Sequence, residues 1–307
     1  LAMGQNHTYN KFILLGITDR PFAQIPLFGL FLLIYIVTLV GNSGIMVLVW
    51  TDPRLHTPVY FFLTHLSFTD ACCSTVVTPK MLADLLLENK TISFTGCVTQ
   101  FYGFAFFATA ACYLLAVMAY DRYVAICNPP LYVMIISQQV RTQLVAASYL
   151  IGFLSAVIYT GSTFGGSFCG PNLIDRFFCN TGPVLKLACS DTYSKEMVIF
   201  VFFVINVVGT KVIILLSYSY ILSTVLRKRS AQSSSRAFRT CASHLTSVSL
   251  FCGTSFFMYL QPSFSHTSLD KVVSVFYTLV TPTLNPLIYS KGHSCEMQEK
   301  DFKLQST

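Results

Sequence analysis

The sequence predicts an all-α protein: a bundle of seven helices that cross a membrane. Of its 307 residues, 53% are hydrophobic and only 11% are charged, whereas about a quarter of the residues of an average soluble domain are charged. The mean hydropathy is +0.60. Seven apolar stretches each reach the length of about 20 residues that a bilayer requires. This composition excludes disordered, collagen-like, coiled-coil and small disulfide-rich secreted proteins.

The predicted spans follow the apolar stretches. They are residues 27–50, 58–87, 97–125, 140–159, 197–226, 237–260 and 272–290. The first contains no charged residue, and the third is uncharged until Asp121. The second contains Asp70 and Lys80, and the fifth contains Lys211, which we expect to face the bundle or a polar cavity.

Basic residues in short loops favour the cytoplasm and therefore predict the orientation. Around the inner ends of spans one, three and five, only Asp52 and Asp121 oppose eight basic residues. These are Arg54, Arg122, Arg141, Arg227, Lys228, Arg229, Arg236 and Arg239. We therefore expect an extracellular segment 1–24, a seven-span domain 25–290 with a long extracellular loop 160–196, and a cytoplasmic tail 291–307.

The expected extracellular segment carries a glycosylation signal. Asn6 begins an Asn-His-Thr triplet, the acceptor pattern for N-glycosylation. A second match begins at Asn89, close to the membrane. Residues 1–24 lack an apolar core long enough for a signal peptide, so we expect the first span to act as an uncleaved signal.

Four of the eleven cysteines fall on the expected outer side, which is oxidising. They are Cys97, Cys169, Cys179 and Cys189. Four cysteines allow three pairings, and the residues alone do not choose among them. Three of them lie in the loop 160–196 beside Phe177 and Phe178, which indicates a folded lid. The spacing of Cys and His fits no zinc site, so we expect neither metal nor cofactor.

Polar residues inside the spans are costly and are candidates for function. Asp70 could bind a cation or water together with Asn42 and Asn285, or the three could form a hydrogen-bonded cluster without ion traffic. Asp121 could hold Arg122 in one state and release it toward a partner in another. The alternative is a pair that reaches the lipid interface.

Two further residues point to a moving bundle. Pro286 follows Asn285 in the seventh span, where proline removes a backbone hydrogen bond and bends the helix. The bend is either a site where packing switches or a purely structural kink. For His244 a hydrogen bond between helices is a better interpretation than a proton relay.

Motifs along nearly the whole chain carry a resemblance to a known family. The most specific are residues 118–127 (MAYDRYVAIC) and 240–245 (TCASHL). The others are residues 41–42 (GN), 55–60 (LHTPVY), 66–70 (LSFTD), 79–82 (PKML), 217–218 (SY) and 282–289 (PTLNPLIY). In these motifs the chain resembles the olfactory (odorant) receptors, within the rhodopsin-like (class A) G-protein-coupled receptors.

The resemblance implies a receptor, not an enzyme. An odorant would bind in the outer half of the bundle, helices five and six would shift, and a stimulatory, olfactory-type heterotrimeric G protein would raise cyclic AMP. The expected location is the plasma membrane, in the cilia of olfactory neurons. Arg122 would be the switch residue facing the G protein. The implied switch set is Asp121, Arg122, Tyr123, Tyr218, His244, Asn285, Pro286 and Tyr289, and the implied disulfides are Cys97–Cys179 and Cys169–Cys189.

The candidate ligand site has two sources. Helical spacing on the third span places six residues on one face: Phe101, Phe104, Ala105, Ala108, Thr109 and Cys112. The resemblance adds Phe202, Phe203, Asn206, Ser255, Tyr259 and Thr278. The third span has no acid between Cys97 and Tyr120 to pair with an amine, and the body of the seventh has no lysine for a Schiff base. The site therefore suits a small, neutral or weakly polar volatile.

The chain departs from the family pattern at four places. Ala111 stands where a Glu is usual, so a second acid beside Asp70 is missing. Cys252 replaces a usual Tyr, which enlarges the pocket floor, and Pro130 replaces a common Leu. From Lys291 onward the usual basic stretch is absent, which leaves coupling or trafficking in question.

Two other classes of membrane protein fit less well. A transporter or channel predicts polar residues along a path and often inverted halves, and the sequence shows neither. An intramembrane hydrolase needs a nucleophile beside a base, but adjacent Ser243 and His244 point to different helix faces. A chemosensory role outside the nose, or a receptor that no longer couples, stays open within the receptor interpretation. We expect no nucleic-acid partner.

Overall fold

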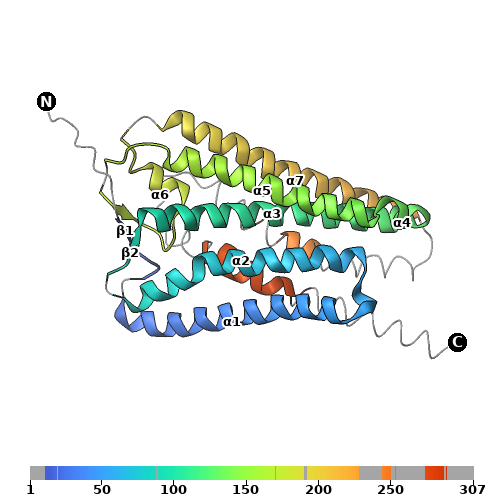
Figure 1. Ribbon diagram of the computed structural model, residues 1–307, viewed down its shortest axis with the longest axis horizontal. Helices are drawn as coiled ribbons and strands as arrows, with labels where there is room; N and C mark the ends of the chain where they lie inside the picture. Colours follow the sequence, from blue (N-terminus) through green and yellow to red (C-terminus); the bar gives the residue numbers. More distant parts are fainter. Residues whose placement is uncertain are drawn as a thin grey trace.

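Long helices lie side by side and form a bundle in the computed structural model (Figure 1). The structure describes residues 11–18, 20–87, 89–169, 171–189, 192–227, 244–249, 253, 274–286 and 288. Its five long helices are α1 (Pro21–Thr51), α2 (Pro58–Leu86), α3 (Phe94–Cys127), α5 (Gln138–Phe164) and α7 (Tyr193–Arg227). Four of them, α1, α3, α5 and α7, are long and apolar enough to cross a membrane.

These helices correspond to the first five predicted spans. The predicted ranges lie inside the helices, except that the second runs one residue past the end of α2. Of the sixth, only residues 244–249 and 253 are described, and they are helical. The seventh contains η3 (Phe276–Val280), a π-helical stretch, followed by helical residues 281–286. This segment packs against α1 and α2 (Figure 1).

Local sequence signals set the helix ends. Proline occupies the first position of α1 and α2, where its missing N–H costs nothing. The hydroxyls of Ser93 and Ser137 cap α3 and α5 by accepting hydrogen bonds from the backbone N–H groups of Gly96 (3.0 Å) and Val140 (3.4 Å). Short helical turns fill the connections: η1 (Pro53–Leu55), η2 (Pro129–Leu131), which contains Pro130, and α4 (Tyr132–Ile135).

One end of the bundle carries a small sheet that the sequence did not predict. Its strands β1 (Lys11–Leu14), β2 (Thr91–Ser93) and β3 (Leu173–Ile174) pair in the order β2-β1-β3. The β1–β2 pair is antiparallel and the β1–β3 pair is parallel. Phe12 and Leu14 alternate with more exposed residues and are fully buried, so the sheet covers an apolar interior.

Two disulfides fix this end. Cys97–Cys179 and Cys169–Cys189 have Cα–Cα distances of 5.6 and 5.0 Å. They confirm the pairing that the family resemblance implied. We call the three strands, the short helix α6 (Thr181–Leu185) and these disulfides the cap. The expected lid is present, and Phe177 and Phe178 pack beneath it in a cluster with Phe104 and Leu279.

The helix α3 lies at the centre of the bundle and packs against α2, α5 and α7. At the α3–α5 contact, a Cβ added at Gly152 would lie 2.9 Å from the carbonyl oxygen of Phe106. Only glycine permits so close an approach of the two backbones. A core cluster of the bundle contains Leu114 and Leu115 of α3 and Ile214 of α7.

Candidate ligand-binding site

A cavity lies between α3, α5 and α7, on the side of the bundle that carries the cap. The cavity has a volume of about 50 Å³. This is several times the volume of about 10–15 Å³ that one water needs. Its walls are Phe101, Phe104, Ala105, Ala108, Thr109, Cys112, Tyr159, Asn180, Thr181, Ile199, Phe203, Asn206 and Val207. The cavity therefore has room for a small molecule, and none of these described lining residues is acidic or basic.

The α3 wall consists of the six residues that helical spacing placed on one face. All of them, from Phe101 to Cys112, line the cavity. Residues three or four apart in a helix share a face, which explains the agreement. Phe104 also contacts Phe178, with ring centroids 5.5 Å apart, so the cap closes over this wall.

The α7 wall differs from the expectation. Phe203 and Asn206 line the cavity together with Ile199 and Val207, which the sequence reasoning missed. Phe202 is not among the lining residues, because neighbouring residues lie about 100° apart around a helix. Helical spacing could have identified both residues, since Ile199 and Val207 lie four residues on either side of Phe203.

Three other expected contacts have different outcomes. Thr278 is fully buried and donates to the carbonyl of Ser274 at 2.8 Å, and it does not line the cavity. Ser255 and Tyr259 lie outside the described residues. So do Cys252, Tyr289, Asn6 and the tail from residue 291.

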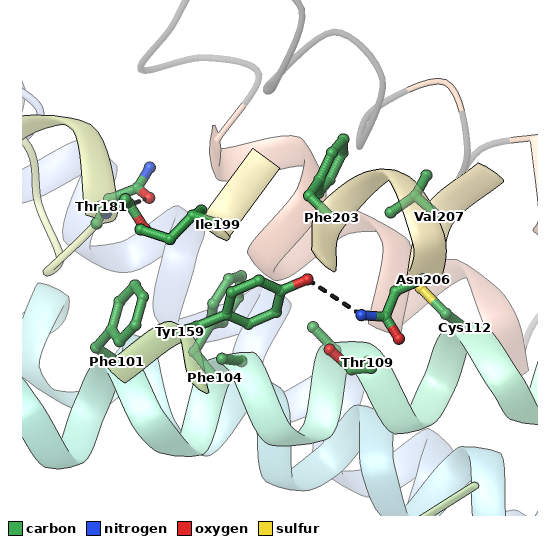
Figure 2. Close-up of a pocket in the computed structure, with 13 residues that line it drawn as sticks. Phe101, Phe104, Thr109, Cys112, Tyr159, Thr181, Ile199, Phe203, Asn206 and Val207 are labelled. Carbon is green, nitrogen blue, oxygen red and sulfur yellow. Dashed lines mark hydrogen bonds between the residues drawn. The ribbon is translucent and has the colours of Figure 1, made fainter. Parts of the chain in front are cut away.

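The amide of Asn206 connects three helices at the wall of the cavity. Its Nδ2 donates to the carbonyl of Phe202 at 2.7 Å and to the hydroxyl of Tyr159 on α5 at 3.2 Å (Figure 2). Its Oδ1 accepts from Tyr113 of α3 at 3.0 Å and from Ser155 of α5 at 3.4 Å. Asn206 is only 4% exposed. Its polar atoms are therefore fully engaged within the protein.

The candidate switch residues Asp121 and Arg122 lie toward the opposite end of the bundle. Asp121 does not hold Arg122: in the described part of the chain the one ion pair joins Lys80 to Asp84. Instead, Tyr132 of α4 donates to Oδ1 of Asp121 at 2.9 Å. In this structure Tyr132, from the connection after α3, is the partner of the Asp121 carboxylate, and the exchange of Arg122 between two states stays a prediction.

Two residues of the switch set, Tyr218 and His244, contact each other. The Tyr218 hydroxyl lies 2.5 Å from Nδ1 of His244, and the two rings are stacked. His244 is buried, as expected for a hydrogen bond between helices. Tyr123 packs against Tyr220 of α7, with ring centroids 5.8 Å apart. Lys211 is half-buried on α7.

A family model described as olfactory receptor matches residues 31–299. The chain belongs to the olfactory receptor family. Mouse olfactory receptor 5AP2 is 53% identical over 294 residues, covering 95% of this chain and 91% of that relative. Human olfactory receptor 8U3 is 50% identical over 280 residues, covering 91% of this chain and 86% of that relative.

The structural comparison shows the fold of this olfactory receptor. The crystal structure of squid rhodopsin matches with a TM-score of 0.72 at 19% identity, over 92% of this chain and 81% of that chain. The chain is therefore a seven-helix protein of the rhodopsin type, and its family and apolar helices make it a multi-pass membrane protein.

The polar core of the receptor lies between α1, α2 and the segment after η3. Nδ2 of Asn285 donates to Oδ2 of Asp70 at 2.7 Å. Asn42 does not join this pair but donates to the carbonyls of Pro282 at 3.1 Å and Thr38 at 2.9 Å. Among the described residues, no three His, Cys, Asp or Glu side chains come together. Asp70 and Asn285 therefore form a hydrogen-bonded pair, and Asn42 bonds separately to the backbone.

Two neighbouring positions complete this region. A Cβ added at Gly41 would lie 3.2 Å from Cβ of Pro286, so α1 approaches the proline closely. Ala111, where a second acid was missing, is buried on α3.

Proposed function

We propose that this olfactory receptor binds a small, neutral or weakly polar volatile in the cavity between α3, α5 and α7. The supporting observation is the lining itself: apolar and aromatic side chains with a few hydroxyl and amide groups, and no charge among the described members. An ionised ligand would lose its hydration there without gaining a partner. An uncharged ligand gains dispersion and apolar burial.

The ligand would bias the packing of α7 and of the sixth helix, and a stimulatory heterotrimeric G protein would engage the opposite end. Phe203 and Asn206 belong to the cavity wall, and Tyr218 on the same helix contacts His244. A shift of α7 at the cavity would therefore act on that contact. We place Arg122, with Asp121 and Tyr123, on the surface that the G protein binds, and expect cyclic AMP to rise.

The proposed topology places the cap outside the cell and α4 inside, as the basic residues predict. Disulfides persist in oxidising compartments, so the two in the cap support an extracellular position. We place the protein in the plasma membrane of olfactory cilia, with Asn6 glycosylated and the tail 291–307 in the cytoplasm.

To test this proposal, the tagged receptor is expressed in cells that contain an olfactory-type stimulatory G protein. The cyclic AMP level is then measured after addition of each volatile from a panel. Arg122→Ala is compared with Arg54→Ala, a basic residue in the η1 turn. We expect a dose-dependent rise that Arg122→Ala abolishes and Arg54→Ala preserves at equal surface expression. A ligand response that is indifferent to Arg122 would refute the proposed switch.

A further inference from the structure

Two amides line the pocket, that of Asn180 in the cap and that of Asn206 on α7, and the amide of Asn206 is not open to a ligand. Both hydrogens of Asn206 Nδ2 and both acceptor positions of its Oδ1 are used by Phe202, Tyr159, Tyr113 and Ser155. A ligand that bonded to Asn206 would have to break a contact between helices. Asn206 therefore builds the wall of the pocket, and recognition of a polar ligand atom needs another group.

Thr109 supplies such a group. It lies on the α3 wall and is 7% exposed, and in Figure 2 it projects toward the Tyr159–Asn206 hydrogen bond. Its hydroxyl makes no hydrogen bond within the described part of the chain. Threonines in helices usually donate to the carbonyl four residues earlier, as Thr210 does here at 2.7 Å. With respect to the described residues, the Thr109 hydroxyl instead has its donor and acceptor positions open.

The other polar lining residues lie elsewhere. Asn180 and Thr181 belong to the cap, where Oδ1 of Asn180 accepts from the backbone N–H of Thr181 at 2.8 Å. The residues flanking Thr109 on the α3 face are Ala105, Ala108 and Cys112. On this α3 face a ligand meets one hydroxyl, that of Thr109, while across the cavity the Tyr159 hydroxyl already accepts a hydrogen bond from Asn206.

We propose that Thr109 is the specificity-determining residue of this pocket and that its ligand is a neutral oxygenated volatile, a ketone or an alcohol. The Thr109 hydroxyl bonds to the ligand oxygen and thereby disfavours a hydrocarbon of the same shape. This inference rests on the proposed function of the cavity. The selectivity is moderate, because with a hydrocarbon bound Thr109 can turn to the backbone and satisfy itself.

The experiment measures binding directly, without a G protein. Purified receptor is heated with rising concentrations of four probes that form two pairs of equal shape: cyclohexanone with methylenecyclohexane, and cyclohexanol with methylcyclohexane. The half-maximal concentration for raising the melting temperature is compared within each pair. The variants are Thr109→Val, which keeps the shape and removes the hydroxyl, and Thr109→Ser, which keeps the hydroxyl.

We expect the natural receptor to favour at least one oxygenated probe over its partner by about three- to tenfold, the effect of one net hydrogen bond. Thr109→Val should bring that ratio close to one by weakening the oxygenated probe alone, and Thr109→Ser should preserve it. Preference for the ketone means that Thr109 donates, since a ketone only accepts. An unchanged ratio in Thr109→Val, equal binding within both pairs, or no shift with any probe would overturn the inference.

A parallel cyclic AMP assay with the same variants separates this inference from the proposed function. Binding that depends on Thr109 without a cyclic AMP response would refute coupling and leave the inference intact. A cyclic AMP response whose selectivity ignores Thr109→Val would support the receptor function and refute the inference.

Discussion

The contact between α3 and α5 allows a sharp test, because two glycines on α5 have different surroundings. A Cβ at Gly152 would lie 2.9 Å from the carbonyl oxygen of Phe106 and 3.3 Å from Cβ of Ala110, whereas a Cβ at Gly161 would have no heavy atom within 4 Å. Gly152→Ala must therefore push the helices apart, and Gly161→Ala must not.

The magnitude follows from two opposing effects. Replacing glycine by alanine inside a helix stabilises it by about 1 kcal/mol, and this gain applies to both positions. Overpacking costs about 1–3 kcal/mol and applies only to Gly152. The difference between the two variants cancels the helix propensity, so Gly152→Ala should unfold about 1–3 kcal/mol more easily than Gly161→Ala.

Thermal unfolding of the purified proteins in the same detergent measures this difference. A loss of about 1–3 kcal/mol corresponds to several degrees in Tm for a chain of this size, and surface expression in cells should fall in the same order. Equal Tm values for the two variants would refute the close α3–α5 approach. A lower Tm for Gly161→Ala would refute it as well.

Two further predictions concern hydrogen bonds between elements. Asn206→Leu should lower the free energy of unfolding by about 2 kcal/mol, because it removes several interhelical hydrogen bonds of about 0.6 kcal/mol each. Tyr113→Phe removes one such bond and should lower it by only about 0.6 kcal/mol. Equal losses in Tm for the two variants would contradict this network. Tyr132→Phe should raise cyclic AMP without ligand, because it releases Asp121, and unchanged basal signalling would contradict that role. Burial, with the nearby Asp121 carboxylate, raises the pKa of Tyr132 above its usual value. Tyr132 should therefore keep its proton up to about pH 9, and basal signalling should be flat from neutral pH to about pH 9.

The long helices could be predicted from the sequence because an apolar stretch of sufficient length is a local signal. The α3 wall of the cavity was predicted for the same reason, since helical periodicity alone assigns residues from Phe101 to Cys112 to one face. The disulfide pairing was not accessible from spacing, and only the family motifs implied it. Without the paths of the loops, the three possible pairings of the four cysteines cannot be distinguished.

Contacts that depend on the path of a connection were missed. The residues of β2 and β3 are too few to show alternation, and their partner β1 lies far away in the sequence. Tyr132 reaches Asp121 only because η2 and α4 turn back beneath α3, and the adjacent Arg122 was the more obvious partner. Asn180 and Thr181 line the cavity because the cap folds inward, which no local pattern indicates.

The small sheet of the cap has a consequence for how the chain is threaded through the membrane. Strand β1 is translated before α1, β2 before α3, and β3 only after α5. Two long helices separate β1 from β2, and two more separate β2 from β3, so all three strands reach the same face when every intervening helix crosses once. One skipped crossing would leave a strand on the wrong face, where neither its backbone partners nor the matching cysteine could be reached. The sheet therefore closes only when the number of membrane crossings between its strands is even. In a chain with one crossing missing, a strand of the sheet remains unpaired.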